Sequence, residues 1–374
     1  MQFNFFKDKK ILITGHTGFK GSWLTLWLTE IGAQVIGYSL KPNTEPDLFT
    51  ALGLEKKIKH HIADIRDYAK LNQVIQAEQP EIIFHMAAQP LVRRSYKDPR
   101  ETYEVNVMGT VNLLEAVRHC DSVRTVINIT TDKVYENQDY GQAFREDDAL
   151  GGYDPYSSSK AAAELVTASY RNSFFNPKDH GTKHSVAIST VRAGNVVGGG
   201  DWSEDRLIPD CIKALENKKT IEIRNPYATR PWQHVLEPLA GYLQLAIKLN
   251  QDPKAYAQAW NFGPRHDSII NVEELVKKLI EYWGQGEYQV DKGEHVHEAK
   301  YLELDIQKAV RKLNFSPILT IDENLRMTVD WYKEFYQNPK TIQEFSLKQI
   351  KTYHQRRFAS FEDALRRTSH SQIS

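Results

Sequence analysis

A glycine-rich segment near the N terminus constrains the fold more than any other feature of this chain. The segment Gly15–Gly21, GHTGFKG, joins a strand-like stretch, Lys10–Thr14, to a helix-like stretch, Ser22–Ile31. Its first glycine permits a tight turn, its second lets the backbone approach a pyrophosphate, and its third lets helix and strand pack closely. The helix N terminus then offers free N–H groups and a positive dipole to phosphate. In this context we favour a dinucleotide site over a plain strand–helix turn, with contacts from Gly15, Thr17, Gly18, Phe19 and Gly21.

Short apolar runs alternate with amphipathic stretches through the first half of the chain. The predicted strands are Lys10–Thr14, Gln34–Tyr38, Ile58–Ile62, Glu81–His85, Thr125–Ile129 and Val186–Val191. The predicted helices between them are Ser22–Ile31, Leu71–Glu78, Asn106–Arg118 and Lys160–Tyr170. Such alternation implies right-handed crossovers, and it predicts an α/β fold with a doubly wound parallel Rossmann sheet.

The pattern changes after Arg192, where glycines and prolines mark loops. A helix at Pro238–Leu249, a strand at Ala259–Phe262 and a helix at Val272–Trp283 follow, and a helical, aromatic and increasingly basic segment begins at Leu325. A chain of 374 residues is too long for one ordinary core. We therefore expect a Rossmann domain over 1–192 with a return segment over about 232–262, a smaller C-terminal α/β substrate-binding lobe from 193–231 and 263–330, and a C-terminal helical tail over 331–374.

The composition excludes several classes of protein. The 48 basic and 48 acidic residues balance, which argues against a general affinity for nucleic acid or acidic membranes. No apolar run is long enough to span a bilayer, so we expect no membrane partner. The only cysteines, Cys120 and Cys211, form no metal-binding pattern and fit a reducing cytoplasm. His295 and His297 have no supporting carboxylate pattern, and we expect no metal.

The adenosine end of the predicted site is less regular. An acidic residue at the end of the second strand would bind the ribose diol of NAD, but Tyr38 or Ser39 stands there, with Lys41 nearby. No arginine follows to bind a 2′-phosphate, and we favour NAD as the cofactor. Asp64, after the third strand, either binds adenine together with neighbouring backbone or caps the next helix.

Candidate catalytic residues follow in chain order. Tyr156 and Lys160 are four residues apart, which places both on one face of a helix. A lysine ammonium would lower the tyrosine pKa towards neutrality, so that the phenolate could take a proton from a sugar hydroxyl. Thr131, Asp132 and Lys133 directly follow a strand, where they offer a hydroxyl, an acid and a base, unless they belong to a solvated charged loop.

These motifs together resemble the extended short-chain dehydrogenase/reductase family that acts on nucleotide sugars. The resemblance runs from about Lys10 to about Phe315, and it rests on Gly15–Gly21, His85–Gln89, Asn106, Thr131–Lys133 and Tyr156–Lys160. Within this family the chain is similar to the NAD-dependent sugar-nucleotide 4,6-dehydratases. Lys133 and the segment Ala87–Tyr96 resemble the branch that acts on CDP-glucose, whereas the dTDP-glucose branch carries glutamate in place of Lys133.

The resemblance implies a redox-neutral cycle. Tyr156 takes the C4 hydroxyl proton while hydride leaves C4 for NAD, and the ketone acidifies C5. Asp132 protonates the departing C6 hydroxyl, and hydride returns to C6 to give the 4-keto-6-deoxy sugar nucleotide. Lys133 either removes the C5 proton, for which its pKa must fall, or stays charged and stabilises the enolate.

The resemblance also assigns binding residues. It implies cofactor contacts from Asp64, Ile65, Ala87, Ala88, Gln89, Asn106, Tyr156 and Lys160. It implies substrate contacts from Arg94, Asn195, Arg206, Arg230, Lys300 and Tyr301, with guanidinium groups on the diphosphate. It further implies a homodimer or homotetramer, cytoplasmic, in deoxysugar biosynthesis for lipopolysaccharide O-antigen. The rival functions are another nucleotide-sugar dehydratase, a 4-epimerase, and a non-enzymatic dinucleotide sensor on the same fold.

Overall fold

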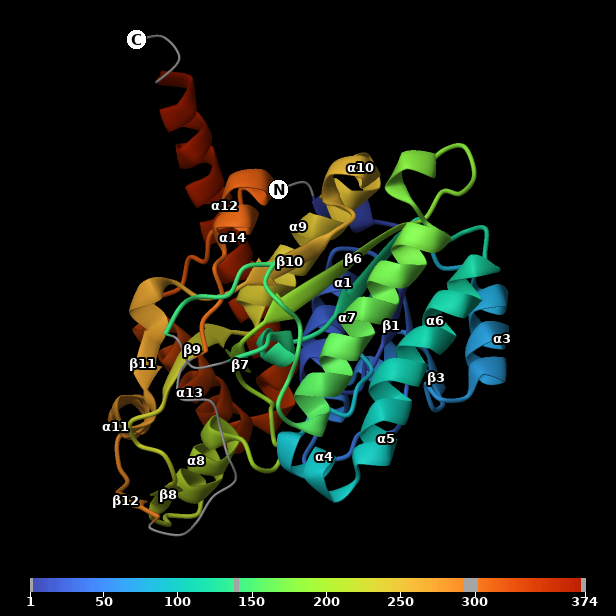
Figure 1. The fold of residues 1–374 in the computed structure, drawn as a ribbon. Coiled ribbons are helices and arrows are strands. Elements are labelled where there is room, and N and C mark those ends of the chain that lie inside the picture. The colour runs from blue at the N-terminus through green and yellow to red at the C-terminus, as the bar shows by residue number, and fades with distance from the viewer. Residues whose placement is uncertain (1–2, 138–140, 292–301, 371–374) are drawn as a thin grey trace.

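The chain is built on a parallel sheet, as predicted. A computed structural model describes residues 3–137, 141–291 and 302–370, with side chains up to Arg357. Within these residues, seven strands form one parallel sheet in the order β3-β2-β1-β4-β5-β6-β10 (Figure 1). The strands are β1 (Lys10–Thr14), β2 (Gln34–Ser39), β3 (Lys59–Ile62), β4 (Ile82–His85), β5 (Thr125–Ile129), β6 (Ala187–Ala193) and β10 (Ala259–Phe262). The predicted α/β class is confirmed, and the strand order reverses between β1 and β4, where ligands bind in such sheets.

Two hydrophobic cores cover the two faces of the sheet. Along β1, Ile11 and Ile13 point into one core and Leu12 into the other, because successive side chains of a strand face opposite sides. Helices α3 (Tyr68–Glu78), α6 (Gly109–Arg118) and α7 (Pro155–Ser173) pack on the Leu12 face (Figure 1). Helices α1 (Phe19–Glu30) and α9 (Leu236–Gln251) pack on the other.

Smaller sheets follow the Rossmann strands. A three-stranded sheet consists of β7 (Asn195–Val197), β9 (Thr229–His234) and β11 (Ile269–Asn271), and a two-stranded sheet of β8 (Ile221–Ile223) and β12 (Tyr288–Val290). The longer helices beside them are α8 (Leu207–Glu216), α11 (Val272–Trp283) and α12 (Gln307–Leu313). Short helices elsewhere are α2 (Leu48–Ala51), α4 (Val92–Lys97), α5 (Pro99–Tyr103) and α10 (Pro253–Tyr256). Among the described residues, no helix is both long enough and apolar enough to cross a bilayer.

The predicted elements differ from the observed ones mainly at helix starts. The strands at Thr125–Ile129 and Ala259–Phe262 and the helix at Val272–Trp283 are found as predicted. The helix predicted from Asn106 is instead continuous with α5 through a π-helical turn, Glu104–Met108. Helix α7 begins five residues before the predicted start, because the Asp154 carboxylate accepts a hydrogen bond from the Ser157 N–H and Pro155 occupies the first helical position.

The C-terminal helices pack into the same core as the Rossmann strands. They are α13 (Ile321–Gln337) and α14 (Ile342–His370), and the predicted boundary at residue 331 falls inside α13. Trp331 and Tyr332 are fully buried, and the Trp331 ring packs so closely on Gly199 that any side chain there would clash. The helical character predicted from Leu325 onward is confirmed, while the division of the chain into lobes stays a prediction.

A buried ion pair fastens α14 to the start of α9. The Glu237 carboxylate, 1% exposed, lies 3.5 Å from the Arg357 guanidinium and accepts a hydrogen bond of 2.7 Å from the Tyr353 hydroxyl. Its other oxygen accepts the backbone N–H groups of Ile318 and Leu319 at 2.7 and 2.8 Å. A buried carboxylate with this many donors is stable only while its partners remain.

We predict that Arg357→Met lowers the free energy of unfolding by about 3 kcal/mol, because it leaves the Glu237 charge buried without its cation. Urea denaturation measures the change. Arg356→Met is the matched control: the neighbouring Arg356 forms an exposed pair with Glu323 at 2.5 Å, and its loss should cost under about 1 kcal/mol. Equal losses for the two variants would contradict the prediction.

Candidate active site

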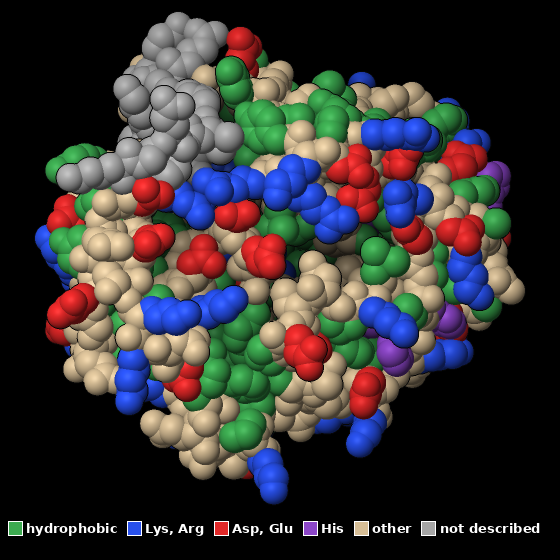
Figure 2. Space-filling model, turned by 90° about the horizontal axis from the view of Figure 1, so that it is seen from below, with side chains coloured by type: hydrophobic (Ala, Val, Ile, Leu, Met, Phe, Trp, Pro, Cys, Tyr) green, Lys and Arg blue, Asp and Glu red, His purple; other side chains and the backbone are tan. Residues whose placement is uncertain are grey.

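The predicted site segments meet in one cleft at the carboxyl ends of the central strands. The cleft has a volume of about 710 Å³ and is lined by the glycine-rich turn, by Ala87–Gln89 after β4, by Thr130–Lys133 after β5 and by the start of α7. It therefore lies at the carboxyl ends of β1 and β4, the neighbouring strands between which the strand order reverses. Lys and Arg side chains gather in a band across the lower face of the molecule, the side of α4, α5 and α8 in Figure 1 (Figure 2). Such a surface suits an anionic ligand.

The glycine-rich turn has the geometry that a dinucleotide pyrophosphate requires. Gly15 has φ +76°, and a Cβ there would lie 2.7 Å from the Ala87 nitrogen. A Cβ on Gly21 would collide with the Gly15 carbonyl, so both glycines are needed for the turn itself. Gly18 is the N-cap of α1 and provides no side-chain hydrogen bond, so the first N–H groups of the helix are available to a phosphate.

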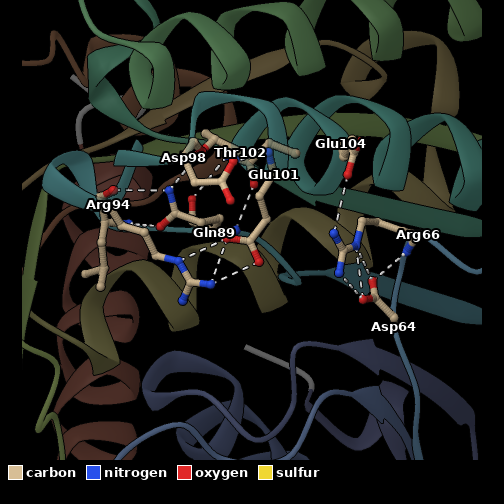
Figure 3. A network of polar contacts seen from close by, with 10 residues as sticks. Asp64, Arg66, Gln89, Arg94, Asp98, Glu101, Thr102 and Glu104 are labelled. Atoms are coloured by element: carbon tan, nitrogen blue, oxygen red, sulfur yellow. Dashed lines mark hydrogen bonds and ion pairs between the residues drawn. The ribbon is translucent and has the colours of Figure 1, made fainter. Parts of the chain in front are cut away.

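Asp64 lies in the cleft, but it does not cap a helix. Asp67 is the N-cap of α3 and accepts the Lys70 N–H at 3.0 Å, so the capping interpretation of Asp64 was wrong. Figure 3 shows the Asp64 carboxylate against the Arg66 guanidinium, with a shortest contact of 2.7 Å. Hydrogen bonds from Arg66 hold the pKa of Asp64 below its usual range. Ile65 also lines the cleft, and adenine binding at these residues stays a prediction.

The end of β2 carries no acidic side chain. Tyr38 is buried and its hydroxyl donates to the Asp64 carbonyl at 2.8 Å. The Ser39 hydroxyl lies 2.9 Å from that of Thr17, and both residues line the cleft together with Lys41. The expectation that Tyr38 or Ser39 replaces the usual acid is therefore confirmed.

Asn106 lies behind the cleft rather than in its lining. Its carbonyl oxygen accepts the Gln89 N–H at 2.9 Å, and its amide donates to the Gln89 carbonyl and to the Ser159 hydroxyl. The Gln89 amide is bonded in turn to Leu91 and Thr102 (Figure 3). Ala87, Ala88 and Gln89 line the cleft, and cofactor binding by Asn106 stays a prediction.

Tyr156 and Lys160 share one face of α7, as predicted, and both line the cleft. The Lys160 ammonium donates to the Ile129 carbonyl at 3.0 Å, and burial lowers its pKa to about 8. The expected lowering of the tyrosine pKa is wrong for the ligand-free protein. Burial raises the pKa of Tyr156 to about 12, opposed by a hydrogen bond with Thr131 and by the charge of Arg206.

Asp132 has a buried carboxyl group, and only one of its two oxygens accepts a hydrogen bond within the described residues. The Thr131 hydroxyl donates to its Oδ1 at 3.0 Å, while its Oδ2 has no hydrogen-bond partner among the described residues. Burial raises the pKa of Asp132, opposed by the charges of Lys133 and Arg230. A carboxyl that resists ionisation and has a free oxygen can donate a proton. Lys133 is half-buried beside it in the cleft, and its role stays a prediction.

A buried ion pair that the sequence analysis missed fixes α7 against the sheet. Glu164 and Arg192 are 4% and 3% exposed at their side chains and lie 2.9 Å apart. Thr130 and Thr190 each donate to the Glu164 carboxylate at 2.6 Å. Glu164 follows Lys160 by one helical turn, and a carboxylate on the same helix face as Tyr156 and Lys160 is the signal that could have revealed it.

Lys20 is a second missed residue. It lines the cleft from the first turn of α1, and its ammonium lies 3.4 Å from the Tyr242 hydroxyl. Burial, with the charges of Lys160 and Arg206, lowers its pKa to about 7. A lysine inside the glycine-rich segment Gly15–Gly21 is the signal that could have identified it.

The predicted substrate residues occupy different parts of the cleft. Arg206 binds Asp201 at 3.0 Å, and Arg230 is 6% exposed near Asp132. Arg94 is paired with Glu101 at 2.7 Å, as Figure 3 shows, and Asn195 lines the cleft at the start of β7. The remaining two predicted residues, with the histidines considered for a metal, lie outside the described residues: Lys300, Tyr301, His295 and His297.

Two further arginines were missed. Arg93 of α4 and Arg224 after β8 both contact the Asp205 carboxylate, at 3.3 and 3.4 Å. All three residues line the cleft, so this pair of contacts joins its two sides. Arg93 could have been identified from the two consecutive arginines of the segment Ala87–Tyr96, from which only Arg94 was predicted to bind substrate.

Comparisons with known proteins agree with this geometry. A family model described as GDP-mannose 4,6 dehydratase matches residues 12–328. The chain is 51% identical over 331 residues to a CDP-glucose 4,6-dehydratase of Salmonella typhimurium, covering 88% of this chain and 92% of that one. It is 28% identical over 334 residues to a dTDP-glucose 4,6-dehydratase of Streptomyces griseus, covering 86% and 93%.

Solved structures share the fold. An epimerase, Mth375 of Methanothermobacter thermautotrophicus, has a TM-score of 0.76 at 23% identity, covering 91% of this chain and 96% of that one. DesIV, a dTDP-glucose 4,6-dehydratase of Streptomyces venezuelae with NAD bound, has a TM-score of 0.74 at 23% identity, covering 89% and 99%.

We predict that Gly18→Ala weakens dinucleotide binding about tenfold or more without destabilising the fold. The reason is that a Cβ at this position would obstruct an approaching phosphate but would not clash with the rest of the protein. A Cβ at Gly18 would lie 3.4 Å from the Gly15 carbonyl oxygen, near ordinary contact distance. Gly21→Ala is the comparison, since its Cβ collides with backbone and should cost about 1–3 kcal/mol of stability. Calorimetric titration with NAD and thermal unfolding measure the two effects. Unchanged binding in the Gly18 variant would refute the pyrophosphate assignment.

Proposed function

The chain belongs to the GDP-mannose 4,6 dehydratase family, and on that premise we propose that it is an NAD-dependent CDP-glucose 4,6-dehydratase. The reaction converts CDP-D-glucose to CDP-4-keto-6-deoxy-D-glucose and water. One observation carries the proposal: 51% identity to a CDP-glucose 4,6-dehydratase over 88% of the chain. The dTDP-glucose dehydratase of S. griseus is much more distant, at 28%.

The cofactor residues are those around the glycine-rich turn. The N terminus of α1 and Gly15 would hold the pyrophosphate, Asp64 and Ile65 the adenosine, and Tyr156 and Lys160 would face the nicotinamide end. NAD, when bound, supplies the acceptor for the hydride that leaves C4 and the donor of the hydride that returns to C6. NAD rather than NADP is supported by solved relatives of the fold that carry NAD.

Tyr156 and Asp132 divide the proton transfers of the reaction. Tyr156 takes the proton from O4 as hydride leaves C4, with the Thr131 hydroxyl positioning O4. The ketone then acidifies the C5 proton. Asp132, whose pKa is raised by burial, gives its proton to the C6 hydroxyl as the C6–O bond breaks, and water leaves. An epimerase has no departing hydroxyl, so the buried free oxygen of Asp132 favours a dehydratase.

Lys133 and the arginines complete the site. Lys133 adjoins Asp132 and either removes the C5 proton or stabilises the enolate by its charge. Arg206 and Arg230 bind the diphosphate, because a guanidinium group can bind two phosphate oxygens at once. Asn195 provides a neutral hydrogen-bonding group beside them.

We also propose a setting for this activity. Both cysteines, Cys120 and Cys211, are free and buried, which suits a reducing cytoplasm. The chain would act as a homodimer or homotetramer on a nucleotide sugar, in deoxysugar biosynthesis for lipopolysaccharide O-antigen. Sedimentation velocity of the purified protein tests the oligomeric state.

The first test is substrate preference. The protein is incubated with CDP-, dTDP-, GDP- and UDP-glucose and with GDP-mannose, and the 4-keto product is followed by its absorbance in base. We expect CDP-glucose to have the highest kcat/KM. A clearly higher kcat/KM for dTDP-glucose would refute the proposed substrate, and the absence of a 4-keto product from every sugar would refute the dehydratase itself.

A second test separates oxidation from elimination. Tyr156→Phe should abolish both steps, because it removes the group that takes the O4 proton. Asp132→Asn should oxidise C4 but slow water loss by about 10²–10⁴, so that the absorbance band of the reduced cofactor accumulates after mixing. Lys133→Ala should behave likewise if the amine is the C5 base. A loss of less than tenfold in that variant would exclude it as the base.

A further inference from the structure

One end of the cleft has no part of the proposed substrate assigned to it. This end is lined by the start of α8 and by residues of and after β8, Arg224 among them. Figure 1 shows α8 and β8 well away from β3, the strand before Asp64 at the adenosine end. The proposed diphosphate residue Arg206 is the N-cap of α8. The nucleoside would therefore extend past Arg206 to this end, a placement that rests on the proposed function.

Three charged side chains form a cluster at this end of the cleft. Asp205 Oδ1 lies 3.3 Å from the Arg93 guanidinium of α4 and 3.4 Å from the Arg224 guanidinium. The side chains remain accessible, with exposures of 31% for Arg93, 36% for Asp205 and 39% for Arg224. Because the closest contacts use Oδ1, the second carboxylate oxygen and further N–H groups of the guanidiniums can bind a ligand.

The backbone places Asp205 directly beside the proposed diphosphate residue. Asp205 has φ +57°, in the left-handed region that residues other than glycine rarely adopt and aspartate adopts more readily. The loop before it is fixed by Asp201, whose carboxylate accepts the Ser203 N–H at 3.0 Å and binds Arg206 at 3.0 Å. A ligand held by Arg206 through its diphosphate would therefore bring its nucleoside near Asp205.

The bases of nucleotides differ in what such a cluster can bind. Cytosine carries an amino donor at C4 beside an acceptor at N3, whereas uracil and thymine carry an acceptor at O4 beside an N3–H donor. A carboxylate only accepts hydrogen bonds, and a guanidinium only donates them. A neighbouring carboxylate and guanidinium therefore match cytosine at both atoms and oppose uracil or thymine at both.

We propose that Asp205 and Arg224 select the cytosine base of the substrate. Asp205 Oδ2 accepts from the C4 amino group, and the Arg224 guanidinium donates to N3. The 3.4 Å between the two side chains lets them reach neighbouring atoms of one ring edge. Arg93 is a positioning residue that contacts the same carboxylate from α4. Guanine offers a similar donor and acceptor pattern, and the choice of cytosine rests on the 51% identity to a CDP-glucose 4,6-dehydratase.

The alternative is that both arginines bind the diphosphate and that Asp205 only separates them in the ligand-free protein. The two cases differ in how two nucleotides with the same diphosphate compare. A phosphate contact is the same for every base, so its loss weakens the binding of CDP and UDP alike. Selection of the base instead changes the ratio of their dissociation constants, which a purely structural role would leave unchanged.

The test is calorimetric titration of the NAD-saturated protein with CDP and with UDP. The wild type should bind CDP at least about tenfold more tightly than UDP. In Asp205→Asn the two affinities should agree within about threefold, because a side-chain amide can turn to present either a donor or an acceptor. UDP binding should thus become tighter in the variant, which a misfolded protein cannot produce. Asparagine also tolerates the left-handed backbone.

Two results of these titrations would overturn the proposal. One is equal binding of CDP and UDP by the wild type, and the other is an undiminished preference for CDP in Asp205→Asn. Arg224→Met should weaken CDP binding by about tenfold and UDP binding by less. Equal losses for the two nucleotides would assign Arg224 to the diphosphate and overturn its role in base selection.

Asp210→Asn is the matched control. Asp210 is another carboxylate of this end of the cleft, in the first turn of α8. Burial raises the pKa of Asp210 to about 6, opposed by the charge of Arg224 and reinforced by that of Asp205. The preference for CDP should persist in this variant. Its loss here, with none in Asp205→Asn, would assign base selection to Asp210 and overturn the proposal for Asp205.

Failure of the proposed function is distinguishable from failure of this inference. The titrations use nucleoside diphosphates and need no turnover, whereas the proposed function fails when CDP-glucose yields no 4-keto product. GDP serves as a third ligand, because guanine shares the donor and acceptor pattern. Tighter binding of GDP than of CDP by the wild type would overturn the choice of cytosine.

Discussion

The buried ion pair between Arg192 and Glu164 is the interaction on which the geometry of the cleft depends. Arg192 lies on β6, next to β5 in the sheet, and Glu164 on the helix that carries Tyr156 and Lys160. Burial alone would raise the pKa of Glu164, but the Arg192 guanidinium and two threonine hydroxyls bring it below its usual range. Arg192 also donates to the Tyr135 hydroxyl at 2.7 Å, just after the Thr131 turn. One charged pair thus fixes α7 to β6 and, through Thr130, to the end of β5.

The second constraint is the close packing of aromatic rings on the backbone of the loop that follows β7. Through this packing the C-terminal helix α13 supports the cleft. The Trp23 indole of α1 donates to the Gly199 carbonyl at 2.9 Å, while Trp331 of α13 packs on the same glycine. The Tyr332 hydroxyl donates to the Asp201 carbonyl at 2.5 Å, and the Asp201 carboxylate in turn holds Arg206. Helix α13, which follows the last strand of the Rossmann sheet, therefore supports the loop bearing a proposed substrate residue.

These two constraints explain what the sequence could and could not predict. Strand–helix periodicity and the glycine spacing are local, so the sheet and the positions of Gly15, Tyr156 and Lys160 followed from short windows of sequence. The Glu164–Arg192 and Glu237–Arg357 pairs join residues 28 and 120 positions apart, so no local pattern connects either glutamate with its arginine. Capping by Asp64 stayed open as an alternative because two aspartates precede α3 and local spacing does not choose between them. The tyrosine pKa was misjudged because the lysine was given more weight than burial.

Burial shifts the pKa values of acids and bases in the cleft in opposite directions. The net charge of the ligand-free cleft is therefore sensitive to the binding of a charged substrate. It lowers the pKa of Lys20 to about 7 and of Lys160 to about 8, and it raises the pKa of Asp132. Each group is thereby moved towards its neutral form near neutral pH. An anionic diphosphate entering the cleft favours protonation of all three, since a nearby negative charge stabilises a cation and disfavours a carboxylate. Binding of a nucleotide sugar would therefore favour the protonated forms of Asp132, Lys20 and Lys160, so that substrate binding and the charge of the cleft would be coupled.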